Sequence, residues 1–415
     1  MSLELENVPQ TIVQTKRMLR DQLPNLDQVL AEVEAHVQEE VAEIRDRRDR
    51  GDSVIPELDY ATIAAGEVSA AAVEDIKRRG AVVIRQVIPR HEADAWNEQL
   101  GDYITDNGYD DTEVDPSLDQ YFSGLKAGLP QIFGIYWSRP QVLCRQAEGL
   151  AQARAFLNRL WISRRGNEVF FDPDRECIYA DRIRRREPGD DTLGLSPHMD
   201  AGSVERWIDP SYRHVYRNVF SGHWRDYDPF DGAYRVEAKE IPSPAVCSAF
   251  RTYQGWTALT PQGPGDGTLQ LIPIIRGIAY HLLRGLCDDV PEDELAGAAP
   301  CRALSVTERW HAPLLAGLVS IPRVEPGDTV WWHTDVAHAV EDVNRGSGYA
   351  NVIYVGAAPS CAKNAAYLQK QKAAFLTGES PPDFAAENHE VNYPGRATPD
   401  DLTELGKRQM GLIDW

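Results

Sequence analysis

Pro197-His198-Met199-Asp200-Ala201-Gly202 and a later stretch, Glu325-Pro326-Gly327-Asp328-Thr329-Val330-Trp331-Trp332, decide how this chain is interpreted. Residues i and i+2 of a strand share a face, so His198 and Asp200 would direct an imidazole and a carboxylate at one point. The second stretch is a turn followed by an apolar strand, and it continues to His338. A late antiparallel strand of a jelly roll can return such a histidine to an earlier His-x-Asp.

The surrounding sequence consists of short β-type runs separated by Gly and Pro. The runs from about Phe170 onward include 245–250, 268–275, 329–332 and 351–355, after an earlier one at 168–171. Regularly spaced short strands predict an antiparallel sandwich or barrel. Two insertions interrupt the pattern: 203–236, which is dense in Trp, Tyr, Arg and Asp, and 277–318, which reads as mostly helical.

Helical periodicity dominates both ends of the chain. Helices are expected over 11–50, 61–79 and 91–104, with a strand over 80–88, and again after Pro359 through Leu376 and over 401–410. We therefore expect three parts: a helical N-terminal extension (1–75), a β domain with the two insertions (76–360) and a helical C-terminal tail packed on that domain (361–415). The apolar stripe of the extension predicts packing on the barrel or pairing with another subunit, hence a monomer or homodimer.

Charge and composition exclude several classes of partner. The formal net charge is -21, which disfavours binding to nucleic acid or to anionic membranes and leaves a small-molecule substrate as the expected partner. The six cysteines form no Cys-x-x-Cys pair, which argues against a structural zinc site and a disulfide framework. The start, MSLELENVPQ, lacks the features of a signal peptide, and no long apolar run predicts a membrane span, so a cytoplasmic location is expected.

A third block lies between the first two: Trp256-Thr257-Ala258-Leu259, then Gly265-Asp266-Gly267-Thr268-Leu269-Gln270-Leu271-Ile272-Pro273. Over residues 76–360 the three blocks, in this order, resemble the phytanoyl-CoA hydroxylase-like branch of the iron(II)/2-oxoglutarate-dependent oxygenases. More closely, they resemble its DUF1479 group. The resemblance implies a mainly β fold with α, a double-stranded β-helix (jelly roll, cupin-like) with helical N-terminal extension and helical C-terminal tail.

The same resemblance implies a chemistry. His198, Asp200 and His338 would be the metal ligands and catalytic residues, a facial triad for Fe(II) that leaves positions open for 2-oxoglutarate and O2. Trp256 matches a tryptophan that lines the 2-oxoglutarate pocket. The implied activity is oxidation of a C–H bond of a small polar metabolite, an amino acid among the candidates, by hydroxylation, desaturation or oxidative cyclisation. Two alternatives stay open: a non-catalytic metal- or ligand-binding jelly-roll protein, and a cupin-like metal-dependent hydrolase or isomerase.

The sequence departs from the family pattern at the expected co-substrate arginine. The family usually carries an arginine roughly ten to thirteen residues past the distal histidine to clamp the far carboxylate of 2-oxoglutarate. Here that window, 348–351, contains none, and Arg345 is expected on a loop. Arg251 is the predicted substitute, with Asn351 as its hydrogen-bonding partner. Because Arg251 and Trp256 have opposite strand parity, both can line one pocket only if a bulge intervenes near Gly255.

Three further segments have open interpretations. His333-Thr334-Asp335 is a second His-x-Asp close to His338, but we expect His333 to support the site or line the pocket rather than bind metal. The basic run at 182–186 is expected to be a solvated face, although one arginine could point inward. The aromatic and charged insertion at 203–236 is expected to cap the mouth of the barrel.

Overall fold

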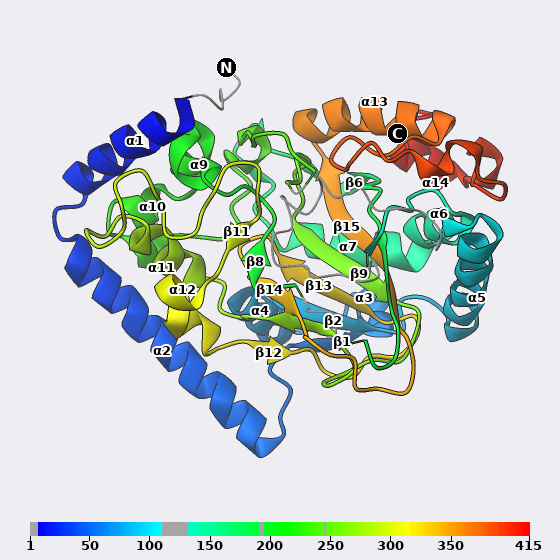
Figure 1. Cartoon of the computed structure of the whole chain (residues 1–415), viewed down its shortest axis with the longest axis horizontal. Coiled ribbons are helices and arrows are strands. Elements are labelled where there is room, and N and C mark those ends of the chain that lie inside the picture. Colours follow the sequence, from blue (N-terminus) through cyan, green and yellow to red (C-terminus); the bar gives the residue numbers. More distant parts are fainter. Residues whose placement is uncertain (1–6, 110–131, 191–194, 245) are drawn as a thin grey trace.

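The computed structural model describes residues 7–109, 132–190, 195–244 and 246–415, in which two main sheets face one another (Figure 1). The larger sheet has the order β1 (Glu57–Asp59), β2 (Ala81–Arg85), β13 (Thr329–His333), β9 (Tyr253–Ala258), β15 (Ala350–Ser360), β7 (Ile183–Arg186) and β3 (Ile132–Phe133), with β6 (Asp172–Cys177) also paired to β15. The smaller has the order β11 (Leu304–Ser305), β8 (His198–Met199), β14 (His338–Val340), β10 (Leu269–Leu271) and β12 (Val319–Ser320). A separate hairpin joins β4 (Arg164–Arg165) to β5 (Glu168–Val169).

The centre of the larger sheet is strand β9, which pairs antiparallel with β13 on one side and β15 on the other. These strands and β2 are almost entirely buried, so both faces at the centre of this sheet are covered. The predicted strands around 80–88, 268–275, 329–332 and 351–355 are confirmed. The one predicted at 245–250 is wrong for residues 246–250, which form bends and loop, while residue 245 lies outside the described part.

Helices cover the sheets on both sides (Figure 1). They are α1 (Val8–Gln22), α2 (Leu26–Arg50), α3 (Tyr60–Ala65), α4 (Ala70–Arg79), α5 (Arg90–Asp106), α6 (Arg139–Arg145), α7 (Glu148–Arg159), α8 (Glu205–Ile208), α9 (Pro210–Val215), α10 (Arg217–Phe220), α11 (Gly277–Arg284), α12 (Glu308–Leu315), α13 (Ala362–Thr377) and α14 (Glu404–Gln409). The helix expected over 11–50 is two helices, because Pro24 lies in the short break between α1 and α2.

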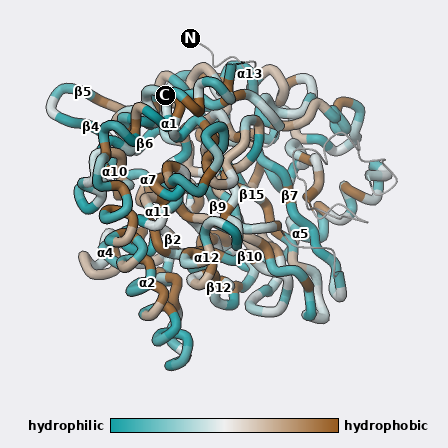
Figure 2. Tube along the Cα trace, turned by 60° about the vertical axis from the view of Figure 1, so that its left-hand side comes forward, coloured by the Kyte–Doolittle hydropathy of each residue, from teal (hydrophilic) through white to brown (hydrophobic). Residues whose placement is uncertain are grey.

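The apolar stripe of the N-terminal extension is covered within the chain itself. Val33 and Val37 of α2 are fully buried, and α2 packs on α11 and α12. Figure 2 shows hydrophobic segments gathered in the interior strands, while hydrophilic segments predominate along the outer helices. Of the two expectations for this stripe, packing on the chain's own body is the one that the structure shows.

The insertion at 203–236 is part of the core and not a cap over the mouth. Arg206, Tyr216, Tyr227 and Arg235 all direct polar atoms at the fully buried carboxylate of Asp335. Arg206 Nη1 and Arg235 Nη2 each lie 2.7 Å from it, and the Tyr216 hydroxyl donates at 2.8 Å. This network ties the helices α8–α10 to the turn that follows β13.

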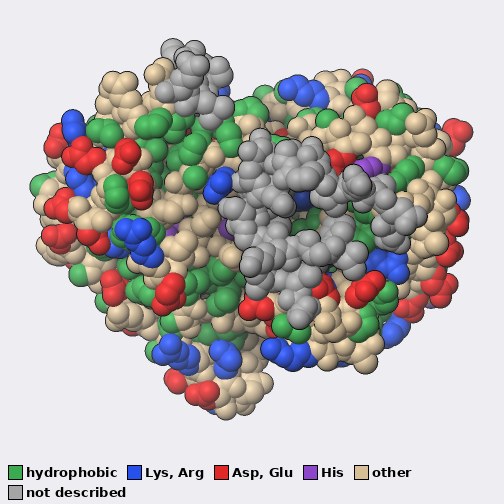
Figure 3. All heavy atoms as spheres, in the orientation of Figure 1, with side chains coloured by type: hydrophobic (Ala, Val, Ile, Leu, Met, Phe, Trp, Pro, Cys, Tyr) green, Lys and Arg blue, Asp and Glu red, His purple; other side chains and the backbone are tan. Residues whose placement is uncertain are grey.

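Three further features concern the surface charge, the cysteines and the hydropathy of the helices. Acidic and basic side chains are interspersed over the face shown in Figure 3. All six cysteines are free thiols. None of the helices in the described ranges is both long enough and apolar enough to cross a membrane.

The Asp335 network generates a stability prediction. Asp335→Ala removes the acceptor and leaves two buried guanidinium groups without their counter-charge, so the free energy of unfolding should fall by about 3–5 kcal/mol. Urea unfolding followed by circular dichroism measures it. The exposed Asp342→Ala is the control and should change the free energy by less than about 0.5 kcal/mol. A loss equal to that of the control would contradict the assigned role.

A buried histidine pair generates a pH prediction. His281 and His311 stack with ring centroids 3.9 Å apart, and neither is exposed. Burial lowers the pKa of His311 to about 3, and burial with the neighbouring His311 lowers that of His281 well below its usual value. The unfolded chain therefore binds protons that the folded chain does not, so stability is complete above about pH 6.5 and falls as the pH drops toward 3.

At pH 5 both histidines should have lost part of their contribution, about 2 kcal/mol for His311, whose pKa is about 3. His281→Phe should therefore reduce the difference between the unfolding free energies measured at pH 7 and pH 5. The exposed His91→Phe should leave the difference unchanged. An identical pH profile for the parent and His281→Phe would rule out this origin of acid sensitivity.

Candidate metal centre

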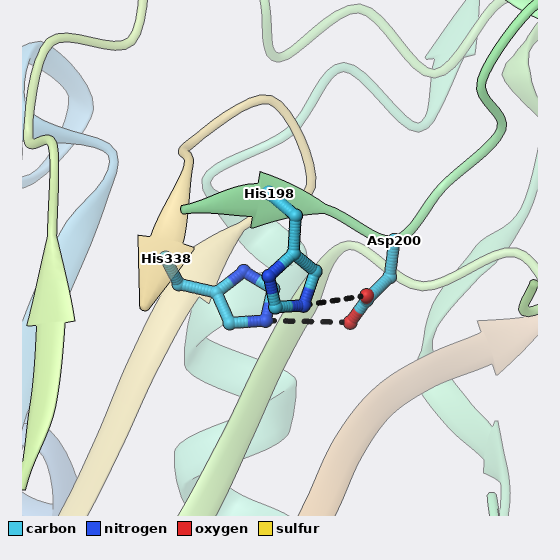
Figure 4. Close-up of side chains that lie close together, drawn as sticks. All are labelled: His198, Asp200 and His338. Atoms are coloured by element: carbon cyan, nitrogen blue, oxygen red, sulfur yellow. Dashed lines mark ion pairs between the residues drawn. The ribbon is translucent and has the colours of Figure 1, made fainter. Parts of the chain in front are cut away.

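Three side chains from two paired strands of the smaller sheet converge at one point. His198 begins β8 and His338 begins β14, and the two residues are direct cross-strand partners. Their rings lie 4.2 Å apart between centroids. Asp200 follows β8 and, two residues after His198, turns its carboxylate to both rings (Figure 4).

The distances suit a shared metal ion. Asp200 Oδ1 lies 3.3 Å from His198 Nε2, and Asp200 Oδ2 lies 3.5 Å from His338 Nε2. One ligand atom from each residue lies within 4.8 Å of the others, and no other His/Cys/Asp/Glu group in the described residues meets this test. Ligand atoms that each lie about 2.0–2.2 Å from one ion are separated from one another by distances similar to these 3.3 and 3.5 Å contacts. Two imidazoles and one carboxylate directed at one point are the donor set of a facial triad.

Burial and the mutual contacts of the three groups set their protonation. His198 Nδ1 lies 2.6 Å from the Ser196 carbonyl oxygen and donates to it, which directs Nε2 at Asp200. Burial opposes protonation of His198, but its hydrogen bond to Asp200 and the charge of that carboxylate together outweigh burial and raise its pKa. Burial opposes ionisation of Asp200, but the nearby imidazoles of His338 and His198 and the cation of Arg251 outweigh it and hold the pKa of that carboxyl well below its usual range. Burial, with repulsion from His198, lowers the pKa of His338 to about 3. The centre thus presents a carboxylate and a neutral imidazole at neutral pH.

A cavity of about 170 Å³ opens directly on these residues. Its wall mixes apolar and charged groups from distant parts of the chain, including Leu195, Pro244, Val246, Cys247, Arg251, Gln254, Leu269, Arg302, Ser305, Trp332, Val340, Tyr354, Asp383 and Phe384, as well as Asp181 and Arg182. A small polar molecule fits the size and the character of such a wall.

Arg251 is the predicted co-substrate residue that the structure brings to the cavity. It precedes β9, is 4% exposed, and stacks its guanidinium over Tyr179 at 4.9 Å. Its Nε and Nη2 atoms are buried without a hydrogen-bond partner among the described residues. Two unpaired donors of a permanent cation are suited to a bidentate carboxylate.

Trp256 and Asn351 lie away from the cavity wall. Trp256 is buried on the face of β9 that also carries Gln254, but it packs beyond the cavity, opposite Tyr354. Asn351 turns its amide outward and donates to Asn97 Oδ1 of α5 at 2.9 Å. The pairing of Asn351 with Arg251 is therefore corrected: strand parity places Asn351 on the opposite face from Tyr354.

The expected bulge near Gly255 is also wrong. Strand β9 keeps regular register through Gly255 with both neighbours. Arg251 reaches the cavity for a simpler reason, because it lies before the strand begins and is not bound by its parity. Arg345 is exposed and does not line the cavity.

The second His-x-Asp serves the core. His333 is fully buried, stacks on Trp161 at 4.7 Å, and accepts at Nδ1 from the Asp335 backbone N–H. Asp335 is committed to the arginine network, so a metal site built from His333, Asp335 and His338 is excluded by this arrangement. The role of His333 in the pocket is corrected likewise, because its ring lies outside the cavity wall.

The basic run at 182–186 is not a solvated face. Arg184 and Arg186 are buried, and Arg182 lines the cavity. Side chains alternate along β7, so Arg182, Arg184 and Arg186 share a face. The sequence did not indicate that this face is buried, because its residues are charged and no apolar alternation accompanies them.

Sequence reasoning also missed Gln254 and the C-terminal residues Asp383 and Phe384, all of which line the cavity. Gln254 donates its side-chain amide to Asp200 Oδ2. The parity of Gln254 with Trp256 was an available signal. No comparable signal existed for Asp383, which is far from the motifs along the chain and comes to the wall by packing against Tyr179 and Ser248.

Fold and site together define a two-sheet protein with a His-Asp-His set of metal-ligand type on the wall of a small cavity. The chain belongs to the Gig2-like family, whose pattern matches residues 6–412. It is 47% identical over 403 residues to the uncharacterised protein YbiU of Escherichia coli (strain K12), covering 97% of this chain and 96% of that protein.

Two solved structures are similar over nearly the whole chain. A protein of Salmonella typhimurium LT2 with the provisional description oxidoreductase has a TM-score of 0.94 and 44% identity, covering 99% of this chain and 98% of that one. GlcNAc Inducible Gene 2, GIG2 (DUF1479), from Candida albicans has a TM-score of 0.83 and 26% identity, covering 100% of this chain and 91% of that one. The DUF1479 part of the expected resemblance is thereby confirmed.

The geometry generates a prediction on metal binding. His198→Ala, Asp200→Ala and His338→Ala should each weaken iron(II) binding by at least about 100-fold, because each removes one of three ligands. Anaerobic competition with a chromophoric chelator measures the affinity. His333→Ala is the matched control and should keep the metal, although it opens a cavity beside Trp161. Iron retained by His198→Ala but lost by His333→Ala would overturn the assignment.

Proposed function

We propose that this protein is an iron(II)- and 2-oxoglutarate-dependent oxygenase that oxidises a C–H bond of a small polar metabolite, with an amino acid among the candidates. The observation that carries the proposal is the presence, in one cavity, of a facial His-Asp-His set and a buried arginine with two unpaired donors. On this proposal the two facing sheets are the halves of a double-stranded β-helix of the phytanoyl-CoA hydroxylase-like branch.

On this proposal the metal ligands and Arg251 have separate roles. His198, Asp200 and His338 would hold iron(II) from one side and leave the cavity side open. Arg251 would bind the far carboxylate of 2-oxoglutarate with Nε and Nη2, a geometry that lysine does not reproduce. Bound there, iron(II), 2-oxoglutarate and O2 supply the oxidising power for a C–H bond, with succinate and CO2 as the other products.

The rest of the wall supports a polar substrate. Asp181, Arg182, Arg302 and Ser305 line the cavity, so charged and hydroxylated groups meet partners there. The aromatic rings of Trp332 and Phe384 restrict water around the reacting centre. The absence of nucleic-acid and membrane partners, a monomeric or homodimeric state and a cytoplasmic location all stay predictions.

Arg251→Lys tests the proposal. It keeps the charge but loses the two-point contact, so the dissociation constant for 2-oxoglutarate should rise by roughly 10–100-fold while iron(II) affinity stays unchanged. Anaerobic titration of the iron(II) protein, followed through the visible absorption of the chelate, measures both. Arg345→Ala, an exposed arginine outside the cavity, should behave as the parent.

A library of metabolites tested for O2-dependent succinate release would then identify the substrate. Iron(II) binding without any change on adding 2-oxoglutarate would overturn the oxygenase and favour a binding protein. Zinc found by metal analysis of the protein, with no spectral change on adding 2-oxoglutarate anaerobically, would favour a hydrolase or isomerase.

A further inference from the structure

Gln254 Oε1 and Trp332 Nε1 are among the buried polar atoms of the cavity wall that have no hydrogen-bond partner within the described part of the chain. The two side chains are 3% and 2% exposed. Buried polar atoms are nearly always paired in folded proteins, because an unpaired one loses its bond to water and gains nothing in return. Such atoms in the wall of a cavity indicate a ligand that completes them.

The two residues are neighbours on one face of the larger sheet. Gln254 of β9 and Trp332 of β13 are direct cross-strand partners, so their side chains point the same way. Both are anchored beside the metal centre: Gln254 donates to Asp200 Oδ2, and the Trp332 ring lies 5.1 Å from that of His338. A group bound between them would therefore lie close to the metal.

Each of the two atoms is either a hydrogen-bond donor or a hydrogen-bond acceptor. The Gln254 amide nitrogen donates to Asp200 Oδ2, which leaves Oε1 as an acceptor. The indole nitrogen of Trp332 is solely a donor. The pair thus presents one acceptor and one donor, side by side.

We propose that Gln254 and Trp332 form a substrate subsite for a neutral hydroxyl or amide group next to the metal. That group donates to Gln254 Oε1 and accepts from Trp332 Nε1. A carboxylate can accept from the indole but cannot satisfy Gln254, so 2-oxoglutarate does not complete the pair. The inference deepens the proposed oxygenase function and rests on it for the metal.

Proton NMR on the cobalt(II)-loaded protein tests the subsite, because the paramagnetic ion broadens the signals of a small molecule bound beside it. The probes are propionamide and its neutral isostere 2-butanone, whose methyl group cannot donate to Gln254 Oε1, titrated separately without 2-oxoglutarate. Propionamide should bind at least about 5-fold more tightly than 2-butanone, as expected for one additional satisfied hydrogen bond. Zinc-loaded protein gives the diamagnetic baseline.

Trp332→Phe and Gln254→Met each remove one contact and should weaken propionamide binding by about 5-fold at saturating cobalt(II). Trp331→Phe, on the opposite face of β13, and Gln270→Met, in the smaller sheet away from the cavity, are the matched controls and should bind as the parent does. Thermal unfolding of each apo variant checks that the fold is kept.

Equal binding of the two probes, binding of neither, or unchanged binding in both cavity variants would overturn the subsite. The outcome is separable from that of the oxygenase proposal. If cobalt(II)-loaded protein prefers propionamide but iron(II)-loaded protein does not bind 2-oxoglutarate, the subsite stands and the oxygenase falls.

Discussion

The pairing of β8 with β14 is the contact on which the site depends. It is short, yet it places His338 directly opposite His198, and the carboxylate of Asp200 then lies within 3.5 Å of both rings. Because side chains alternate faces along a strand, a slip of one residue would turn one imidazole away from the other. The surrounding structure, from the larger sheet to the helices around it, holds this register.

Much of this was accessible from the sequence because it depends on local pattern. The His-x-Asp spacing, the turn before β13 and the apolar strands predicted the elements that meet at the metal centre. The helices at both ends followed from periodicity, although Pro24 divides the first. Arg251 was predicted because the usual position carried no arginine, and the structure places it in the wall of the cavity.

The remainder depends on contacts between residues far apart in the chain. The motif His333-Thr334-Asp335 resembles a metal site in sequence, but Asp335 pairs with Arg206 and Arg235 of the insertion instead. Those two arginines are far from Asp335 in the chain, so the sequence did not show the pairing. Asn351 was assigned to the cavity before it was known which face of β15 carries it. In the structure its amide points to the other face and donates to Asn97. Arg184 and Arg186 of β7 are buried, although charged side chains usually lie at the surface. No pattern in a single sequence distinguishes buried arginines from solvated ones.

The C-terminal origin of Asp383 and Phe384 has a consequence for the order of assembly. Both lie after the last strand of the sheets, yet they form part of the cavity wall. His198, Asp200 and His338 precede them in the chain, so this part of the wall is synthesised last. The cavity is therefore closed on this side only once the C-terminal segment has packed against Tyr179 and Ser248.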